Sequence, residues 1–355
     1  MAIILTNADV ERLITMHDCI AIFDEAYRHL AEGQGLSRQR SDILIENKSG
    51  ETFYDFKTMD GVAPAFDVAV SRIDSDVLRW EIHDGAKKRV QVPMAAGGYF
   101  SGLIFVFSMS TTELIAIIPD GIIQRLRVGA TNGLAAKYLA NESAETIGIL
   151  GSGWQAGAQL MAITSVRKCK EIRCFSRSKD RRVAFCEEMS ARIGTRVIPV
   201  SSAAEAFEGV DVALCATSSV DPVFRPEWVK PGMHISAVKR SEIPPSVIEK
   251  VDRVFIHDEG MAPIYVHAAG IDPPEKEADT SWTTFASAKK YPLLSDLVAG
   301  NEKGRQSVNE TTIFINNIGT GYQFAVLGAL LYKKARQAGI GKRLPSELFT
   351  QAERP

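Results

Sequence analysis

The sequence predicts an α/β fold in two parts, an α+β region followed by a doubly wound parallel sheet. Three observations lead to this prediction. A short apolar strand at residues 146–150 runs directly into a glycine-rich turn and a helix-like segment. Apolar strands and helical segments then alternate along the chain, as a parallel sheet covered on both faces requires. Residues 1–125 lack this alternation, and their strand-like runs are separated by turns rich in Gly and Asp.

The glycine-rich turn has the layout of a dinucleotide-binding motif. Gly151 is expected to make the tight turn, and Gly153 to let the backbone approach a pyrophosphate. Ala156 or Gly157 would let the helix pack closely on the strand, and the free amides at the helix start would hold the phosphates. Cofactor contacts are therefore predicted for Gly151, Ser152, Gly153, Trp154, Gln155 and Ala156. This turn makes the second part a Rossmann-type dinucleotide-binding domain, with an ordinary strand–helix turn as the alternative.

In the first part, the sequence predicts an N-terminal helix and a mostly antiparallel sheet. The helix is expected at residues 7–32, and the strands at residues 42–46, 69–73, 89–93 and 103–108. Near the end of the chain, residues 321–336 predict one long amphipathic helix, which Gly339 and Gly341 close. Its apolar face holds Phe324, Leu327 and Leu331. A small first domain is not expected to bury this face alone, so the face is predicted to lie in an interface.

The second part starts near residue 128 and alternates regularly. After the glycine turn, the pattern predicts a helix through residues 158–163, a strand at 171–175, a helix at 179–192 and strands at 196–199, 211–216, 233–238 and 253–257. The sequence shows no internal repeat and no low-complexity tract. These elements are those of one doubly wound domain.

Composition limits the function classes. The chain has 355 residues, 45% hydrophobic and 24% charged, with a formal charge of −2, so no polyanionic partner and no nucleic acid are expected. The first residues do not resemble a secretory leader, and no apolar stretch is long enough to span a bilayer, so no membrane is expected and a cytoplasmic location is predicted. The five cysteines are odd in number and scattered, which fits a reducing compartment. The six histidines are dispersed, and no metal is predicted.

The end of the second strand predicts which dinucleotide is bound. An acid at this position selects NAD by accepting bonds from the ribose 2′-hydroxyl, and none is present here. The chain has Ser176, Arg177 and Ser178 instead, which suit a 2′-phosphate, so NADP is predicted in preference to NAD. The alternative is that the basic residues here are only a solvated helix start, although cations are disfavoured at a helix N-terminus. Strand ends and later loops add Ala216, Thr217, Val238, Asn317 and Gly319 as further predicted cofactor contacts.

Taken with the glycine turn and the Ser176-Arg177-Ser178 end, several other segments make the chain resemble the ornithine cyclodeaminase/mu-crystallin family. These segments are residues 126–131, 232–238, 294–300, 304–305 and 313–319. The resemblance covers nearly the whole chain. It implies a homodimer that acts on a small amino or imino acid with a nicotinamide cofactor. It further implies a substrate-binding and dimerisation domain at residues 1–127, completed by a C-terminal helix at residues 320–355, and an NAD(P)-binding domain at residues 128–319.

The resemblance also implies that arginines hold the substrate carboxylate. Arg40 and Arg127 fall at the matching places, with Arg38 as the substitute for Arg40. A guanidinium suits this task because it binds a carboxylate with two parallel hydrogen bonds. A surface ion pair is the alternative for either arginine.

The chain departs from the family pattern in the first domain. Where the family usually has a catalytic lysine on a strand, this chain offers Arg72, which stays protonated and cannot act as a base near neutral pH. Arg72 is expected to bind a carboxylate or polarise a carbonyl. Lys57 lies where another active-site residue of the family sits and is predicted to supply the missing ammonium, with a solvated lysine near a turn as the alternative.

A second departure follows residue 238. Where ornithine cyclodeaminases have an aspartate that activates water, this chain has Ser241, with Glu242 beside it. Lys239 and Glu242 are expected to form an acid–base pair at this strand end, and a salt-bridged loop is the alternative. The catalytic residues predicted are thus Lys57, Arg72, Lys239 and Glu242, together with the substrate-binding residues Arg40 and Arg127.

The predicted function is NADP-dependent reduction of an imine, or reversible oxidation of a small amino acid, by hydride transfer. The alternatives are an ornithine cyclodeaminase that forms proline and ammonia, and a protein that binds NADP and a small ligand without turnover. Loops such as residues 260–280 are expected to set the size of the substrate pocket.

Overall fold

The computed structural model describes residues 1–353 except residues 48–50, 84–85, 220, 260–262 and 268–290. Two sheets organise the chain. The first is a ten-stranded, mostly antiparallel sheet in the order β15-β3-β4-β5-β7-β8-β1-β17, with β2 paired to β4 and β6 paired to β5. Its strands are β1 Ala2–Ile4, β2 Leu36–Ser37, β3 Ser41–Glu46, β4 Phe53–Ala63, β5 Val68–His83, β6 Ala86–Val92, β7 Ser101–Ser108, β8 Leu114–Pro119, β15 Ile264–His267 and β17 Lys342–Leu344.

The second sheet has seven strands, and all of its pairings are parallel. The order is β11-β10-β9-β12-β13-β16-β14, which is a doubly wound Rossmann-type sheet. Its strands are β9 Thr146–Leu150, β10 Glu171–Phe175, β11 Val197–Pro199, β12 Val212–Cys215, β13 His234–Ala237, β14 Arg253–Ile256 and β16 Thr312–Ile315. The helices that belong to this half are α4 Trp154–Val166, α5 Lys179–Ile193, α6 Ala203–Phe207 and α7 Pro245–Ile248. The predicted fold class is confirmed.

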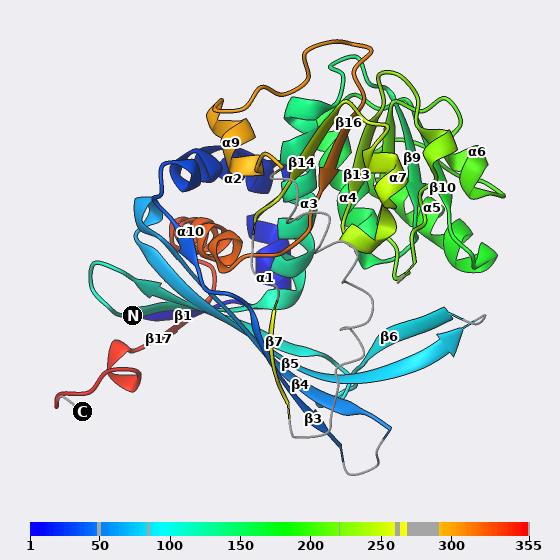
Figure 1. Ribbon diagram of the computed structural model, residues 1–355. Helices are drawn as coiled ribbons and strands as arrows, with labels where there is room; N and C mark the ends of the chain where they lie inside the picture. The colour runs from blue at the N-terminus through cyan, green and yellow to red at the C-terminus, as the bar shows by residue number, and fades with distance from the viewer. Residues whose placement is uncertain (48–50, 84–85, 220, 260–262, 268–290, 354–355) are drawn as a thin grey trace.

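The other α-helices of the described residues pack against one another, and α10 also packs on the long sheet. They are α1 Asn7–Leu13, α2 Met16–Ala31, α3 Asp120–Leu139, α9 Leu294–Ala299 and α10 Gly321–Ala338. Figure 1 shows α10 lying on the long sheet, with α2 above it and the Rossmann half beside them. Helix α3 packs on α4 at very close range, because a Cβ at Gly129 would lie 2.8 Å from the carbonyl oxygen of Ala158. Residue 128, predicted as the domain boundary, falls inside α3, so one rigid helix joins the two halves.

The opening helix predicted at residues 7–32 is two helices. Thr15 starts the second one, since its hydroxyl accepts from the Asp18 amide at 3.2 Å while the Asp18 carboxylate accepts from the Thr15 amide at 2.9 Å. This reciprocal pair is a capping box, which ends the first helix and begins α2. Hydrophobic periodicity alone runs across the break and therefore does not reveal it.

The long sheet contains six strands that the sequence pattern did not predict, and β5 extends well beyond residues 69–73. The unpredicted strands are β1, β2, β4, β8, β15 and β17. Strand β4 was missed because its buried face carries Asp55 and Lys57 in place of apolar residues. Alternation of apolar and polar side chains is the usual strand signal, and here charged residues occupy the buried positions.

Helix α10 ends at Ala338, where Gly339 adopts a left-handed conformation with φ of 65°, which confirms the helix predicted at residues 321–336 and its end at Gly339. Two other expectations need correction. The chain returns after α10 as β17, which pairs with β1, so the C-terminal helix does not occupy the whole of residues 320–355. The apolar face of α10 is not an interface with a partner chain, because Phe324, Leu327 and Leu331 are fully buried in the core of this one chain. Strands β4 and β5 of the long sheet cover them.

In the part of the chain that the structure describes, no helix is both long and apolar enough to cross a membrane.

Candidate active site

The glycine turn forms a cradle at the carboxyl end of β9. Gly151 has φ of 117°, and a Cβ there would overlap the carbonyl oxygen of Ala216, so only glycine fits. Gly153 begins α4 without a side-chain cap, and a Cβ at Gly153 would meet nothing within 4 Å. The amides in the first turn of α4 have no carbonyl partners within their own helix, and the space beside Gly153 is open. This arrangement fits a dinucleotide pyrophosphate.

The other residues of the turn divide between packing and exposure. Ala156 is buried in the core against β9. Gly157 makes room for α3, since a Cβ there would lie 2.6 Å from the Arg125 guanidinium, and it does not serve the strand contact expected of it. Trp154 is 55% exposed and stacks on Arg125 at 4.2 Å, and the buried Oε1 of Gln155 has no hydrogen-bond partner.

The predicted ribose-binding end of β10 is held in a fixed turn. Ser152 Oγ donates to Ser176 Oγ at 2.8 Å, and Ser178 accepts from the Arg181 amide at the start of α5. Arg177 is exposed. Sequence reasoning treated Arg182 only as part of a solvated alternative, but it is buried, donates to the Ser176 carbonyl and stacks on Phe175 at 5.2 Å. The turn therefore presents Ser176 and Arg177 together.

Glu242 ties two strand ends together. It lies in a short 3-10 turn, η3 Arg240–Glu242, and is fully buried. Its Oε1 accepts from the Thr217 amide at 2.6 Å, and its Oε2 accepts from the Val238 and Lys239 amides at 3.1 Å each. Burial raises the pKa of Glu242, and the Thr217 amide opposes that rise. Both carboxylate oxygens are thus engaged by the backbone at the ends of β12 and β13.

The segment after β16 completes this edge. Asn317 Oδ1 accepts from the His257 amide at 3.0 Å, and Asn317 Nδ2 donates to the Asp258 carbonyl at 2.6 Å, so Asn317 joins the ends of β14 and β16. At Gly319, a Cβ would overlap the Arg127 guanidinium. We call the glycine turn and the ends of β10, β12, β13 and β16 the cofactor edge.

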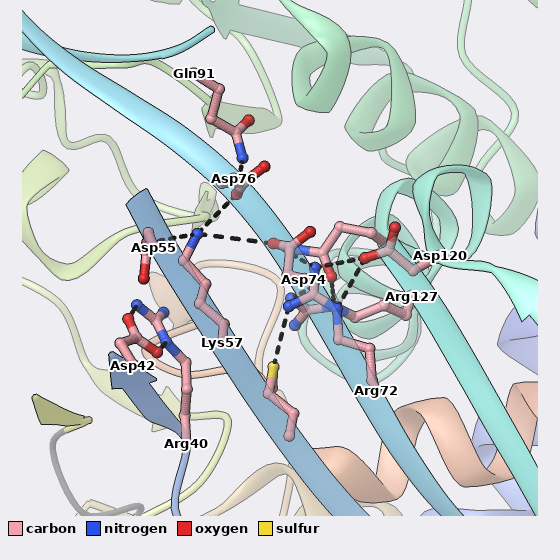
Figure 2. Close-up of polar contacts among 12 residues, drawn as sticks. Arg40, Asp42, Asp55, Lys57, Arg72, Asp74, Asp76, Gln91, Asp120 and Arg127 are labelled. Atoms are coloured by element: carbon pink, nitrogen blue, oxygen red, sulfur yellow. Dashed lines mark hydrogen bonds and ion pairs between the residues drawn. The ribbon is translucent and has the colours of Figure 1, made fainter. Parts of the chain in front are cut away.

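Charged side chains from three strands form a row on one face of the long sheet (Figure 2). Residues two apart on a strand share a face, and the register pairs Asp42 with Lys57, Lys57 with Asp74, and Asp55 with Asp76. The members of this charged row are Arg40, Asp42, Asp55, Lys57, Arg72, Asp74 and Asp76. The row lies on the same face as Met59 and Val70, which belong to the core beneath α10.

Lys57 is enclosed by carboxylates. Its Nζ lies 2.8 Å from Asp55, 2.8 Å from Asp76 and 3.7 Å from Asp74. The residue is 4% exposed and lies in the middle of β4, which excludes the solvated lysine near a turn. An ammonium has three donors, and three carboxylates surround this one.

The two arginines of the row are also paired. Arg72 Nη2 lies 2.8 Å from Asp74 and 2.5 Å from Asp120 at the start of α3. Arg40 forms a two-bond pair with Asp42, in which Nε donates to Oδ1 at 2.7 Å. Arg38, the substitute considered for Arg40, is 77% exposed and pairs with Asp60, so Arg40 is the one that belongs to the row.

Arg127 differs from these cations. It is buried in α3, where Nη1 donates to Gln323 Oε1 at 3.1 Å and Nη2 donates to Gln124 Oε1 at 2.9 Å. Among the residues that the structure describes, no carboxylate forms an ion pair with it. Burial and, to a lesser extent, the nearby Arg72 together lower the pKa of Arg127 to about 9. Removing a cation from water without an acidic partner is costly, so the site is prepared for an anion.

Arg127 also joins the two halves of the site. It contacts Gly319 on the cofactor edge, and its guanidinium carbon lies 5.4 Å from the Phe324 ring. The guanidinium of Arg72 lies at the same distance from that ring. The structure therefore brings together Arg40, Lys57, Arg72 and Arg127 at one side and the predicted cofactor residues at the other. The exposed side chain of Lys239 and the buried Glu242 lie on the cofactor edge.

Sequence reasoning did not single out the acidic side chains. Asp55, Asp74, Asp76 and Asp120 all contact the predicted cations. Charges spaced two apart, in Asp55-x-Lys57 and Arg72-x-Asp74-x-Asp76, were the available signal of a charged strand face. The segment 260–280 lies largely outside the described residues, which include only residues 263–267 of it, and β15 is the element that they form.

Comparison with known proteins gives a consistent picture. The sequence profile described as the ornithine cyclodeaminase/mu-crystallin family matches residues 1–337. A Delta(1)-pyrroline-2-carboxylate reductase of Bacillus cereus is 26% identical over 249 residues, which are 69% of this chain and 74% of that protein.

Two solved structures share the fold over nearly all of the chain. The Thermococcus litoralis Delta(1)-pyrroline-2-carboxylate reductase, in complex with NADH and L-proline, has a TM-score of 0.77 at 24% identity and covers 96% of this chain and 100% of its own. An archaeal alanine dehydrogenase dimer with bound NAD has a TM-score of 0.74 at 23% identity and covers 97% of this chain and 99% of its own.

Proposed function

This chain belongs to the ornithine cyclodeaminase/mu-crystallin family, and from that premise we propose that it is an NAD(P)-dependent oxidoreductase acting on C=N or CH–NH groups. Its reaction would be the reduction of an imino acid, or the reversible oxidation of a small amino acid. Arg127 carries this proposal, because a buried cation without an acidic partner lies against the cofactor edge at Gly319. The pyrroline-2-carboxylate reductases and alanine dehydrogenase among the similar proteins support it.

The cofactor edge has two tasks in this reaction. The amides of the glycine turn would hold the pyrophosphate, and Glu242 and Asn317 would keep the strand ends in place through the backbone bonds already described. When bound, the nicotinamide gives or accepts the hydride, which is chemistry that belongs to the cofactor. The residues of the chain bind, orient and move protons.

The substrate carboxylate would bind at Arg127. Arg40 and Arg72 already have carboxylate partners, whereas the hydrogen-bond partners of Arg127 among the described residues are the amide oxygens of Gln124 and Gln323. Gln323 fixes the direction of Arg127, because its Nε2 in turn donates to Thr131 Oγ1 at 2.5 Å. Lys57 and Arg72 would act by holding the acidic residues of the charged row, and Lys239 would contribute from the cofactor edge.

We propose NADP as the preferred dinucleotide. No acid stands at the end of β10, and the fixed turn presents a serine hydroxyl and the exposed Arg177, which suit a 2′-phosphate.

A turnover screen tests the function. NADPH and NADH would each be incubated with Δ1-pyrroline-2-carboxylate and with pyruvate plus ammonia, and oxidation of the cofactor would be followed by its absorbance. L-Ornithine with a trace of cofactor forms the contrasting arm. We expect imine-dependent oxidation of the cofactor and no proline from ornithine, because Ser241 stands where a water-activating carboxylate would be needed. Proline formed at an enzymatic rate would make the protein a cyclodeaminase, and binding without any turnover would make it a ligand-binding protein.

We also propose that two chains associate through the outer face of the long sheet. The face opposite the charged row carries apolar side chains that are 37–51% exposed, on β3, β7 and β15. They are Ile43, Ile45, Leu103, Phe107, Ile264 and Val266. Such a contiguous apolar face is typical of an interface, and the alanine dehydrogenase with this fold is a dimer.

Light scattering tests the association. Ile45→Asp places a charge on the apolar face and should shift the protein toward monomer. Leu348→Asp, at an exposed leucine away from that face, should not. A wild-type monomer at micromolar concentration would contradict the proposal.

We propose a cytoplasmic location, which the five free cysteines support.

A further inference from the structure

Asp74 occupies a different position from the other carboxylates of the charged row. Asp55 and Asp76 each lie 2.8 Å from Lys57, and Asp76 also accepts from Gln91 at 2.5 Å. Asp120 accepts from both Nε and Nη2 of Arg72. Asp74 has one close cation, Arg72 at 2.8 Å, and lies 3.7 Å from Lys57, beyond hydrogen-bond distance. Its side chain is also the most exposed of these four, at 13%.

The position of Asp74 places it beside the proposed carboxylate anchor. Figure 2 shows Asp74, Arg72, Asp120 and Arg127 gathered together, with Lys57 and Asp55 on the far side of Asp74. Arg72 contacts Asp74 directly, and the guanidiniums of Arg72 and Arg127 lie at equal distances from the Phe324 ring. A small amino acid held at Arg127 by its carboxylate would therefore have its nitrogen within the range of the charged row.

The charges around Asp74 do not balance. On its own strand it faces Arg72 and Asp76, on β4 Lys57 and Asp55, and on α3 Asp120, with Arg127 nearby in Figure 2. The cross-strand residue on β7 is Gly102, which has no side chain. Apart from Arg127, this group holds four carboxylates and two cations. Burial raises the pKa of Asp74 to about 6, and Asp120 and Asp76 reinforce the rise while Arg72 and Lys57 oppose it. A proton or a cationic ligand would relieve the excess of negative charge.

We infer that Asp74 faces the substrate nitrogen, holding it when it is cationic and supplying its proton when an imine is reduced. This inference rests on the proposed function and names the residue that acts at the nitrogen. During reduction, the hydride forms a C–H bond at the imine carbon, and the π electrons of the C=N bond move to the nitrogen. The nitrogen takes the proton of the Asp74 carboxyl, which becomes a carboxylate and is reprotonated from solvent. In amino-acid oxidation the same carboxylate would accept the proton.

A binding measurement separates this role from a structural one. L-Proline and cyclopentanecarboxylate have the same ring size and the same carboxylate, but only proline has the nitrogen. Both would be titrated by calorimetry into the protein with NADH present. We expect the wild type to prefer proline, and Asp74→Asn to reduce that preference about tenfold or more, since a hydrogen bond to a charged group is lost. The matched control is Asp76→Asn, on the same strand face, which should retain the preference.

The pH dependence gives a second readout. Reduction of Δ1-pyrroline-2-carboxylate requires the protonated carboxyl, so wild-type kcat should fall as the pH rises through about 6. In Asp74→Asn, this fall of kcat with pH, the descending limb of the pH profile, should be absent, and kcat should be about a hundredfold lower. Asp74→Glu keeps a carboxyl and should restore part of the rate. Asp76→Asn should keep the limb but move it to lower pH, because one of the carboxylates that reinforce the raised pKa of Asp74 is removed.

The outcomes distinguish this inference from the function on which it rests. An Asp74→Asn protein with the wild-type proline preference and the wild-type pH limb would overturn the inference alone. A wild type that neither binds proline nor reduces the imine would overturn the proposed function, and the inference with it.

Discussion

The cofactor edge and the charged row recognise their ligands in different ways. The cofactor edge works through backbone groups: the first amides of α4 have no side-chain cap, and Glu242 uses three backbone amides to hold β12 and β13. The charged row works through side chains, which pair with one another across β3, β4, β5 and α3. A site made of backbone groups is encoded locally, by a short run of glycines. A side-chain site depends on the pairing of strands that are distant in sequence, so it carries no local motif.

The two regions also differ in the substitutions that they tolerate. On the cofactor edge, a glycine cannot be replaced where a Cβ would meet the backbone. In the charged row, each residue can be replaced sterically, but removing one charge leaves its buried partners uncompensated. The following tests sharpen this difference, in order of decreasing expected effect.

The largest effect is expected from removing Lys57. Lys57→Met leaves Asp55 and Asp76 buried without their nearest cation, and the free energy of unfolding should fall by about 3–5 kcal/mol. Urea unfolding at neutral pH measures this loss. Lys137→Met, which breaks an exposed ion pair with Asp24, is the control and should cost less than about 1 kcal/mol. Equal losses in the two variants would mean that the row is not a buried electrostatic unit.

Arg127→Ala should separate the two regions functionally. Substrate affinity should fall by about a hundredfold or more, because a buried charge pair of this kind contributes about 2–5 kcal/mol when one partner is removed. NADPH binding should remain close to that of the wild type, since Arg127 meets the cofactor edge only at Gly319. Fluorescence titration of NADPH and KM for the imine measure the two effects. Arg127→Lys keeps the charge but not the two-bond geometry and should restore affinity only in part. A comparable loss of NADPH affinity in the alanine variant would argue against separate regions.

Two glycines of the cofactor edge give a matched pair. Gly151→Ala should lower the free energy of unfolding by about 1–3 kcal/mol, because residue 151 has φ of 117° and its new Cβ would meet the Ala216 carbonyl. Gly153→Ala has space for its Cβ and ordinary φ of −101°, so the fold should keep its stability while dinucleotide affinity falls. Thermal unfolding and cofactor titration of both variants test this. Unchanged cofactor affinity in Gly153→Ala would contradict a pyrophosphate at this turn.

The smallest effect is expected at Arg177. Arg177→Ala should reduce the preference for NADPH over NADH by about tenfold to a hundredfold, since one charge-assisted contact to the 2′-phosphate is lost. NADH affinity should not change, and this serves as the internal control. Equal wild-type affinities for the two cofactors would remove the basis of the prediction.

Sequence reasoning was most successful on the cofactor edge. Gly151, Gly153 and Glu242 lie at strand ends of one parallel sheet, as their places after apolar strands predicted. It was less successful in the first domain, where the strand that carries Lys57, the eleven-residue β4, was not predicted. The apolar face of α10 was also misjudged as an interface, because the area that the ten-stranded sheet offers for packing was not visible from the chain.

The sequence by itself determined the Rossmann-type sheet, the glycine turn and the family, because each depends on residues that are close in the chain or on local periodicity. Only the tertiary structure decided which charges meet. Asp55, Lys57 and Asp74 become neighbours through the antiparallel register of β4 and β5, and Asp120 reaches Arg72 from α3. A register shift of one residue would turn each of these side chains to the opposite face. The electrostatics of the site therefore follow from strand pairing, which no local stretch of sequence encodes.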